Sequence, residues 1–256
     1  MAALECRSVC LDYVLSRGRF RALADVNIAI EDREFVSLLG PSGCGKSSLL
    51  NIIAGFVQHT SGSVTVAGRQ VTGPGRDRGM VFQEHALFPW MTVGENIGFG
   101  PKANGVPKEQ RQQKIRELVQ LVGLQGFEDA FPKQLSGGMR QRAAVARALA
   151  NDPEVMLLDE PFSALDEQSR RRVQQEFVRI WQATRKTVLL VTHSVDESIL
   201  MSDRVVVMQT RPGRVREIIP VDLPRPRDET SPQFIQLKRR IGRLIYEDQP
   251  ATEVLG

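Results

Sequence analysis

Residues 40–47 bring glycines, a lysine and a serine into one short segment: Gly40, Pro41, Ser42, Gly43, Cys44, Gly45, Lys46 and Ser47. The segment follows an apolar stretch and precedes a stretch typical of a helix. Glycines let successive backbone N–H groups turn inward, and with the helix N-terminus these groups form a cradle for phosphate. The spacing therefore predicts a nucleotide site, with Lys46 at the β- and γ-phosphates and Ser47 on Mg²⁺. A chance glycine-rich turn between a strand and a helix is the alternative.

A second candidate site follows the apolar residues 155–158. Such a strand delivers Asp159 to the edge of a sheet, where its carboxylate can hold Mg²⁺. On a strand Glu160 would point the other way, toward the γ-phosphate and an attacking water, which is where a general base belongs. The alternative is that Glu160 only caps the turn before Pro161.

Strand and helix patterns alternate along the chain. Strands are expected at 4–9, 26–30, 34–39, 63–66, 79–82, 155–158, 187–191 and 204–208, and helices at 47–54, 108–122, 139–149, 167–183, 196–201 and 233–246. The alternation predicts an α/β protein with a parallel sheet. Together with the phosphate motif, the expected fold is a P-loop NTPase core whose sheet is mixed and mainly parallel, with N-terminal antiparallel strands. A helical subdomain at about 85–150 is inserted into it. Residues 1–220 form the expected ATP-binding domain, and 221–256 a proline-rich linker and an amphipathic helix.

Composition excludes several classes of protein. The 256 residues are 41% hydrophobic and 25% charged, unlike a disordered, collagen-like or disulfide-scaffold chain. No apolar run approaches the roughly 18 residues of a membrane span, and the start lacks the basic and apolar regions of a secretory signal. The expected compartment is the cytoplasm. Cys6, Cys10 and Cys44 are too few and wrongly spaced for a metal cluster, and we expect them to stay reduced.

Positive charge is concentrated near the C-terminus. Residues 211–243 hold nine lysines and arginines and four acids, a net +5, against +4 for the whole chain. Such a segment can meet nucleic acid or an anionic membrane, or it can be a solvated face. The scarcity of aromatic residues there favours the solvated face.

Residues 135–141, Leu-Ser-Gly-Gly-Met-Arg-Gln, read alone as a helix N-cap followed by glycines. Beside the two motifs above, they resemble the signature motif of ATP-binding-cassette (ABC) ATPases. Further stretches resemble other landmarks of that family in the family's order: Gln83 the Q-loop, 163–166 the D-loop, and His193 the switch histidine. Tyr13 stands where the family stacks an aromatic ring on adenine. The resemblance covers about residues 4–220.

This resemblance implies that one chain cannot complete the site. In the family two copies face each other head to tail, and each ATP lies between the phosphate loop of one copy, here with Ser48 included, and the signature motif of the other. Ser136, Gly137 and Gly138 would meet the γ-phosphate across the dimer. Gln83 would join Mg²⁺ and the γ-phosphate to the helical subdomain, and His193 would orient the water. His59 and His85 have no such context, and we expect them to be surface residues.

Three further stretches, 88–93, 211–215 and 223–227, resemble the nitrate, sulfonate and taurine importer ATPases, as does the final helix with 238–241. The implied protein is an ATPase, a translocase subunit peripheral to the cytoplasmic face of the membrane. It would energise uptake of a small, anionic solute through separate permease subunits served by a solute-binding protein, with no nucleic acid bound. The alternative is a non-transport ABC ATPase acting as an ATP-gated clamp on nucleic acid or ribosomes.

Two details stay open. Residues 85–91 are apolar for a loop, so Phe88 and Trp90 either pack inside the helical subdomain or form an exposed anchor for the permease. The thiol of Cys44 could make nucleotide binding sensitive to alkylation.

Overall fold

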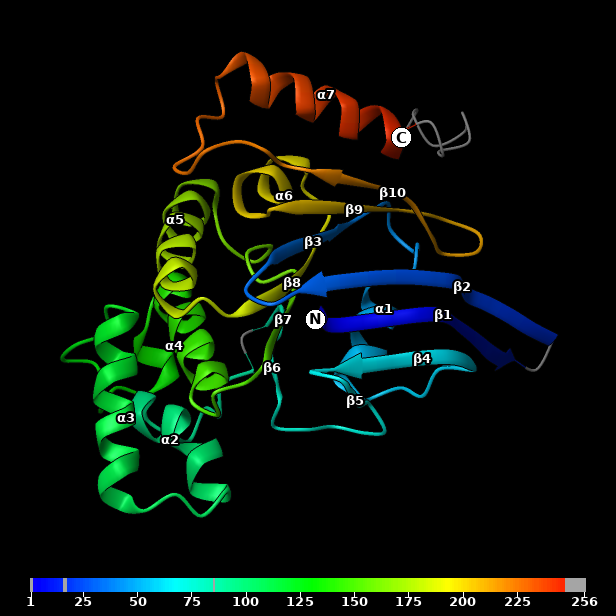
Figure 1. Ribbon diagram of the computed structural model, residues 1–256. Coiled ribbons are helices and arrows are strands. Elements are labelled where there is room, and N and C mark those ends of the chain that lie inside the picture. Colours follow the sequence, from blue (N-terminus) through cyan, green and yellow to red (C-terminus); the bar gives the residue numbers. More distant parts are fainter. Residues whose placement is uncertain (1, 16–17, 85, 247–256) are drawn as a thin grey trace. The chain divides into compact units, whose positions relative to one another are not determined.

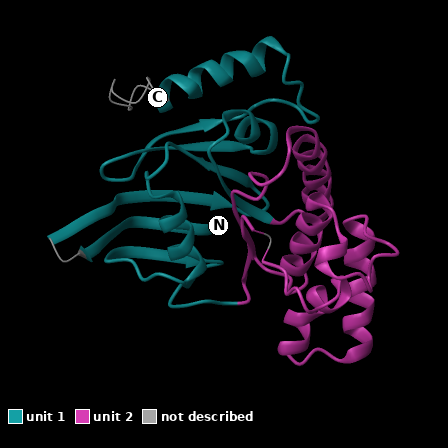
Figure 2. Ribbon diagram, turned by 180° about the vertical axis from the view of Figure 1, so that it is seen from behind, with its two compact units in different colours: residues 1–75, 187–256 teal, residues 76–186 magenta. Residues whose placement is uncertain are grey.

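The computed structural model describes residues 2–15, 18–84 and 86–246 of the chain. The expectation for His85, and that for the end of the segment 221–256, therefore lie outside the described residues. The chain divides into two compact units (Figure 2), residues 1–75 with 187–256, and residues 76–186. We describe each unit by itself. The expected domain boundaries at 85, 150 and 220 stay predictions.

The first unit opens with a long antiparallel hairpin, β1 (Ala2–Leu15) and β2 (Gly18–Glu31) (Figure 1). Strands β4 (Ser61–Val66) and β5 (Arg69–Gln70) extend it into a sheet of order β2-β1-β4-β5. The antiparallel start is confirmed, but the expected strands at 4–9 and 26–30 were too short. Charged residues interrupt the apolar pattern beyond them, whereas a cross-strand ion pair continues the pairing: Arg21 Nε donates to Asp12 Oδ1 at 2.7 Å.

A second set of strands in this unit runs in the order β10-β9-β3-β8. Strands β3 (Phe35–Leu39), β8 (Thr187–Thr192) and β9 (Arg204–Gln209) are mutually parallel along it, and β10 (Arg214–Pro220) closes the edge antiparallel to β9. All of β3 and β8 is buried, as expected of a parallel sheet covered on both faces. Strand β10 was not expected, because its charged residues hide the alternation of an edge strand.

Helices α1 (Lys46–Ala54), α6 (Val195–Met201) and α7 (Pro232–Tyr246) belong to the same unit. Phe234, Ile241 and Ile245 on one face of α7 join Val207 and Ile219 in a hydrophobic core. The expected amphipathic helix is therefore present, and it packs over α6 and β9 (Figure 1).

The second unit combines two parallel strands, β6 (Arg78–Val81) and β7 (Val155–Asp159), with four helices. These are α2 (Val93–Ala103), α3 (Lys108–Leu121), α4 (Gly137–Leu149) and α5 (Glu167–Thr184), and a short 3₁₀ turn (Pro132–Gln134) precedes α4. Helix α4 contacts the other three helices and β6. No helix within the described ranges is long and apolar enough to cross a membrane.

Candidate nucleotide-binding site

The phosphate loop connects buried β3 to α1, as expected. Gly45 is the N-cap of α1, with a left-handed backbone (φ 92°) and no side-chain cap. This backbone conformation favours glycine, and a Cβ on Gly45 would lie 2.5 Å from Leu23 Cδ2, so it would also displace the Leu23 side chain. The first N–H groups of α1 have no intrahelical acceptors, which makes this helix start suited to an anion.

Lys46 is buried over this loop. Its Nζ donates to the carbonyl oxygens of Gly40 (2.7 Å) and Pro41 (3.1 Å), and only 7% of the residue is exposed. A buried ammonium needs such partners, and they hold the charge among the loop's own carbonyls. The cation is thus already inside the cradle that the motif predicts.

Cys44 belongs to the same loop. The residue is fully buried, its Sγ lies 3.8 Å from Lys46 Nζ, and burial raises the pKa of the thiol. A buried thiol that resists ionisation reacts slowly with alkylating reagents. The expected sensitivity to alkylation is therefore not supported. Cys6 and Cys10 are free thiols, as expected, and burial raises the pKa of Cys6 to about 12.

Tyr13 lies beside the start of α1. Its Oη is 3.4 Å from Ser48 Oγ, and 39% of the residue is exposed. The structure thus brings Tyr13 next to the last residue of the predicted phosphate site, with part of the aromatic surface open for stacking.

His193 leaves the sheet at the same edge as the phosphate loop. Parallel strands β3 and β8 are paired with Leu39 opposite Thr192, so Gly40 and His193 both follow the carboxyl ends of neighbouring strands. Ligands bind at this edge of α/β sheets. Ser194, the N-cap of α6, fixes the turn by accepting from Glu197 N, and His193 itself is exposed. His59 is half-buried, with Nε2 at 3.1 Å from Gly62 O.

In the second unit, Asp159 is the last residue of β7 and Glu160 lies in the turn that follows. Because Glu160 is outside the strand, the argument from strand alternation is wrong for this residue. A left-handed backbone (φ 43°) sets its direction instead, and Ser163 N and Oγ both donate to its carbonyl oxygen. Such backbone strain in a residue other than glycine costs about 1–2 kcal/mol and is concentrated at functional sites.

Gln83 leaves β6 at the same edge of this unit. Val81 pairs with Leu158 across the parallel strands, so the chain after β6 and the chain after β7 emerge together. Gln83 is exposed and Glu160 is half-buried. The second unit therefore gathers Gln83, Asp159 and Glu160 at one edge.

The signature residues begin α4. Ser136 is the N-cap, its Oγ accepts from Met139 N at 3.3 Å, and Gly137 and Gly138 form the first turn. The N-cap reading is confirmed. In the D-loop, Asp166 caps α5 in the same way, and hydrogen bonds from Ser169 lower its pKa.

In the apolar segment after Gln83, one aromatic side chain packs against the helices and the other is exposed. Phe88 is half-buried, 4.6 Å from Phe99 between ring centroids, with the Arg147 guanidinium 5.6 Å above its ring. Trp90 is 69% exposed. Fully buried Asn96 fixes the segment, since its side chain bonds to main-chain groups of Phe88, Met91 and Thr92. We did not predict Asn96 from the sequence, although a lone amide on the apolar face of α2 is a usable signal.

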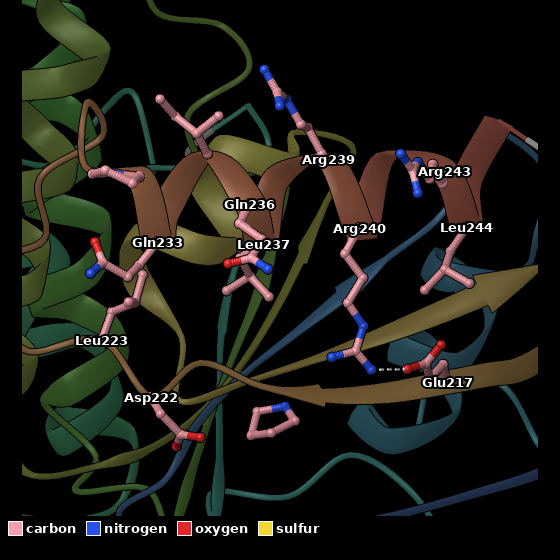
Figure 3. Close-up of a pocket in the computed structure, with 13 residues that line it drawn as sticks. Glu217, Asp222, Leu223, Gln233, Gln236, Leu237, Arg239, Arg240, Arg243 and Leu244 are labelled. Carbon is pink, nitrogen blue, oxygen red and sulfur yellow. Dashed lines mark hydrogen bonds and ion pairs between the residues drawn. The ribbon is translucent and has the colours of Figure 1, made fainter.

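A groove of about 1040 Å³ lies between α7 and β10 in the first unit (Figure 3). Leu237 and Leu244 point into it, and Arg240 reaches across to Glu217. No predicted site residue lines this groove, so we do not assign it to the nucleotide.

The basic segment is largely built into the fold. Lys238 pairs with Asp196 at 2.7 Å, and Arg225 pairs with Asp203 at 2.7 Å. Arg227 is buried and donates to main-chain carbonyls, and burial lowers its pKa to about 10. The solvated-face reading therefore fits only part of the segment.

Comparison with known proteins places this geometry in a family. The family model described as ABC transporter matches residues 23–163. A taurine import ATP-binding protein of Roseobacter denitrificans is 46% identical over 218 residues, 85% of this chain and 81% of that protein. A nitrate import ATP-binding protein of a Synechocystis species is 42% identical over 253 residues, which are 99% of this chain and 95% of that protein.

A solved structure shows the same fold. It is a dimeric ATP-binding cassette in a post-hydrolysis state, bound to ADP and phosphate. It matches with a TM-score of 0.73 and 31% identity, over 85% of this chain and 98% of that one. The P-loop NTPase fold expected from the sequence is thereby confirmed. The chain belongs to the ABC transporter ATP-binding family, and within it resembles the import ATPases for nitrate, sulfonate and taurine.

Proposed function

We propose that this chain is the ATP-hydrolysing subunit of an importer, energising uptake of a small, anionic solute of the nitrate, sulfonate or taurine kind. The observation that carries the proposal is the phosphate loop with Lys46 buried inside it. The two relatives named above, import ATP-binding proteins for taurine and for nitrate, support assignment to an importer. The proposed location is peripheral, on the cytoplasmic face of the membrane, where ATP is available.

We assign ATP to the phosphate loop, residues 40–48, with the adenine ring stacked on Tyr13. The loop glycines pack closely against neighbouring atoms, and the N-terminus of α1 has no side-chain cap, so its N–H groups can bind an anion. Lys46 supplies the positive charge for the β- and γ-phosphates. Ser47 and Asp159 would hold Mg²⁺, an ion that prefers oxygen ligands, and Gln83 would offer a third oxygen. When bound, the ion neutralises developing charge on the phosphates.

Hydrolysis needs a base and an oriented water. We assign Glu160 the role of taking the proton from the attacking water, a role worth about 10²–10⁴ in rate. His193 would contact the γ-phosphate and orient the water. Gln83 would contact the γ-phosphate, and this contact would couple the bound nucleotide to the helices of the second unit.

The proposed partners follow from the incomplete site. A second copy would present Ser136, Gly137 and Gly138 to the γ-phosphate, in keeping with the dimer seen for the related cassette. Separate permease subunits would bind near exposed Trp90, a residue type that often dominates interfaces. A solute-binding protein would act through the permease. A clamp on nucleic acid is not proposed, because ion pairs and burial account for much of the basic segment.

Steady-state hydrolysis tests the proposal. We expect slow, Mg²⁺-dependent hydrolysis by the chain alone, and a loss of about 10²–10⁴ in Glu160→Gln with ATP affinity retained. Glu154→Gln is the matched control, an exposed glutamate just before β7. Hydrolysis by Glu160→Gln at the parent rate would remove Glu160 as the base, and no ATP binding by the parent chain would refute the function.

A further inference from the structure

The turn between β9 and β10, residues 210–213, packs against the phosphate loop. Gly213 is buried, although Arg211 and Arg214 beside it are exposed. Residues 211–215 are also among the stretches that resemble the importer ATPases. The turn is therefore a surface loop with one glycine held inside the unit.

Main-chain hydrogen bonds fix this turn to β2. Gly213 N donates to Ala22 O at 3.0 Å, Ala24 N donates to Gly213 O at 2.9 Å, and Leu23 forms a parallel bridge with Gly213. The side chain of Leu23 in turn packs under Gly45 of the phosphate loop. Strand β2 thus holds the turn and the phosphate loop against each other.

Gly213 has no room for a side chain. A Cβ there would overlap the carbonyl oxygen of Cys44 and lie 2.8 Å from that of Ala22. Both neighbours are backbone atoms, which cannot rotate away as a flexible side chain would. At the other end of the loop, a Cβ on Gly40 would lie 2.8 Å from Met208 O at the end of β9. The β9–β10 hairpin therefore approaches the phosphate loop closely at Gly40 and at Cys44.

The contact fixes the orientation of one peptide group. The Cys44 carbonyl faces Gly213, and in a planar trans peptide the following N–H points the opposite way. The Gly45 N–H therefore points away from the turn. Gly45 is the N-cap of α1, so this peptide sets the direction in which the loop and the helix start present their donors.

We propose that Gly213 is a positioning residue for the nucleotide: it holds the Cys44–Gly45 peptide so that the phosphate loop keeps its N–H groups toward the phosphates. The proposal rests on the nucleotide site proposed above. A larger residue at 213 would push the Cys44 carbonyl and tilt the loop without removing any group that touches ATP.

The test compares Gly213→Ala with Gly73→Ala in the full chain. Gly73 is a loop glycine of the same unit whose added Cβ would meet no atom within 4 Å, and its φ is not left-handed. We expect Gly213→Ala to bind Mg-ATP and Mg-ADP at least about tenfold more weakly in calorimetry. Its KM for ATP should rise while kcat at saturating ATP stays within about twofold. The melting temperature without nucleotide should also fall, because the added Cβ displaces backbone atoms.

The outcomes separate this inference from the proposed function. If the parent and Gly73→Ala bind ATP and Gly213→Ala binds it equally well, the inference is overturned while the function stands. A lower melting temperature with unchanged ATP affinity overturns it too, because Gly213 would then serve packing alone. If Gly213→Ala does not fold, Pro212→Gly decides. This change loosens the turn without adding bulk, and at least threefold weaker ATP binding, about 0.65 kcal/mol, supports the inference, whereas parent-like binding overturns it.

Discussion

The phosphate loop and the signature turn are both helix starts, but they are built in opposite ways. At the first, Gly45 provides no capping side chain, and the loop is packed closely against Leu23 and Gly213. At the second, Ser136 is exposed and caps its own helix through Met139 N. The first start has no capping side chain and depends on its surroundings, whereas the second is capped by its own N-cap residue. Contacts from segments distant in the sequence hold the phosphate loop in place. Hydrogen bonds between neighbouring residues are enough to order the signature turn.

Replacing Lys46 removes the positive charge of the phosphate loop and should have the largest effect on ATP affinity. Lys46→Ala removes charged hydrogen bonds worth about 1.5–3 kcal/mol, so ATP should bind roughly 10–100-fold more weakly in calorimetry. Lys186→Ala is a control, because that side chain pairs with Asp152 in the second unit. Unchanged ATP affinity in Lys46→Ala would contradict the phosphate-site assignment.

Replacing Ser136 tests the second region. Ser136→Ala should lower the free energy of unfolding by about 1 kcal/mol in urea denaturation, the usual value of an N-cap. ATP affinity of the monomer should stay unchanged, because this residue would serve the partner's nucleotide, and hydrolysis should fall. Ser136→Thr keeps a capping hydroxyl and should restore stability. If monomeric Ser136→Ala bound ATP more weakly than the parent, Ser136 would act on the nucleotide of its own chain, contrary to this proposal.

Replacing Trp90 should have the smallest effect on the stability and basal hydrolysis of the isolated chain, because this residue would serve a partner. Trp90 is 69% exposed on a segment that Asn96 fixes, so Trp90→Ala should change unfolding free energy by less than about 0.5 kcal/mol. Basal hydrolysis should also persist. Stimulation of hydrolysis by the reconstituted permease is expected to be lost, and full stimulation would show that the permease binds elsewhere.

The phosphate loop could be predicted from sequence because its chemistry is local. The left-handed backbone of Gly45 and the hydrogen bond from Lys46 to the Gly40 carbonyl are constraints that lie within residues 40–47 themselves. The cap at Ser136 was predictable for the same reason. The fold class followed from alternating strand and helix patterns, which depend on short-range periodicity.

What the sequence could not show depends on contacts between distant segments. Gly213 looks like an ordinary turn glycine until β2 and Cys44 are placed against it. The direction of Glu160 followed a left-handed turn rather than strand alternation. Buried Arg227 shows that sequence charge alone does not reveal which arginines face solvent.

In the proposed dimer two copies share each ATP, and the mass of the Glu160→Gln variant in solution tests this sharing most directly. With the base removed, ATP and Mg²⁺ should stay bound, and sedimentation velocity should show a dimer with Mg-ATP and a monomer without nucleotide. Lys46→Ala should remain monomeric under both conditions. A Glu160→Gln chain that holds ATP yet stays monomeric would contradict the account.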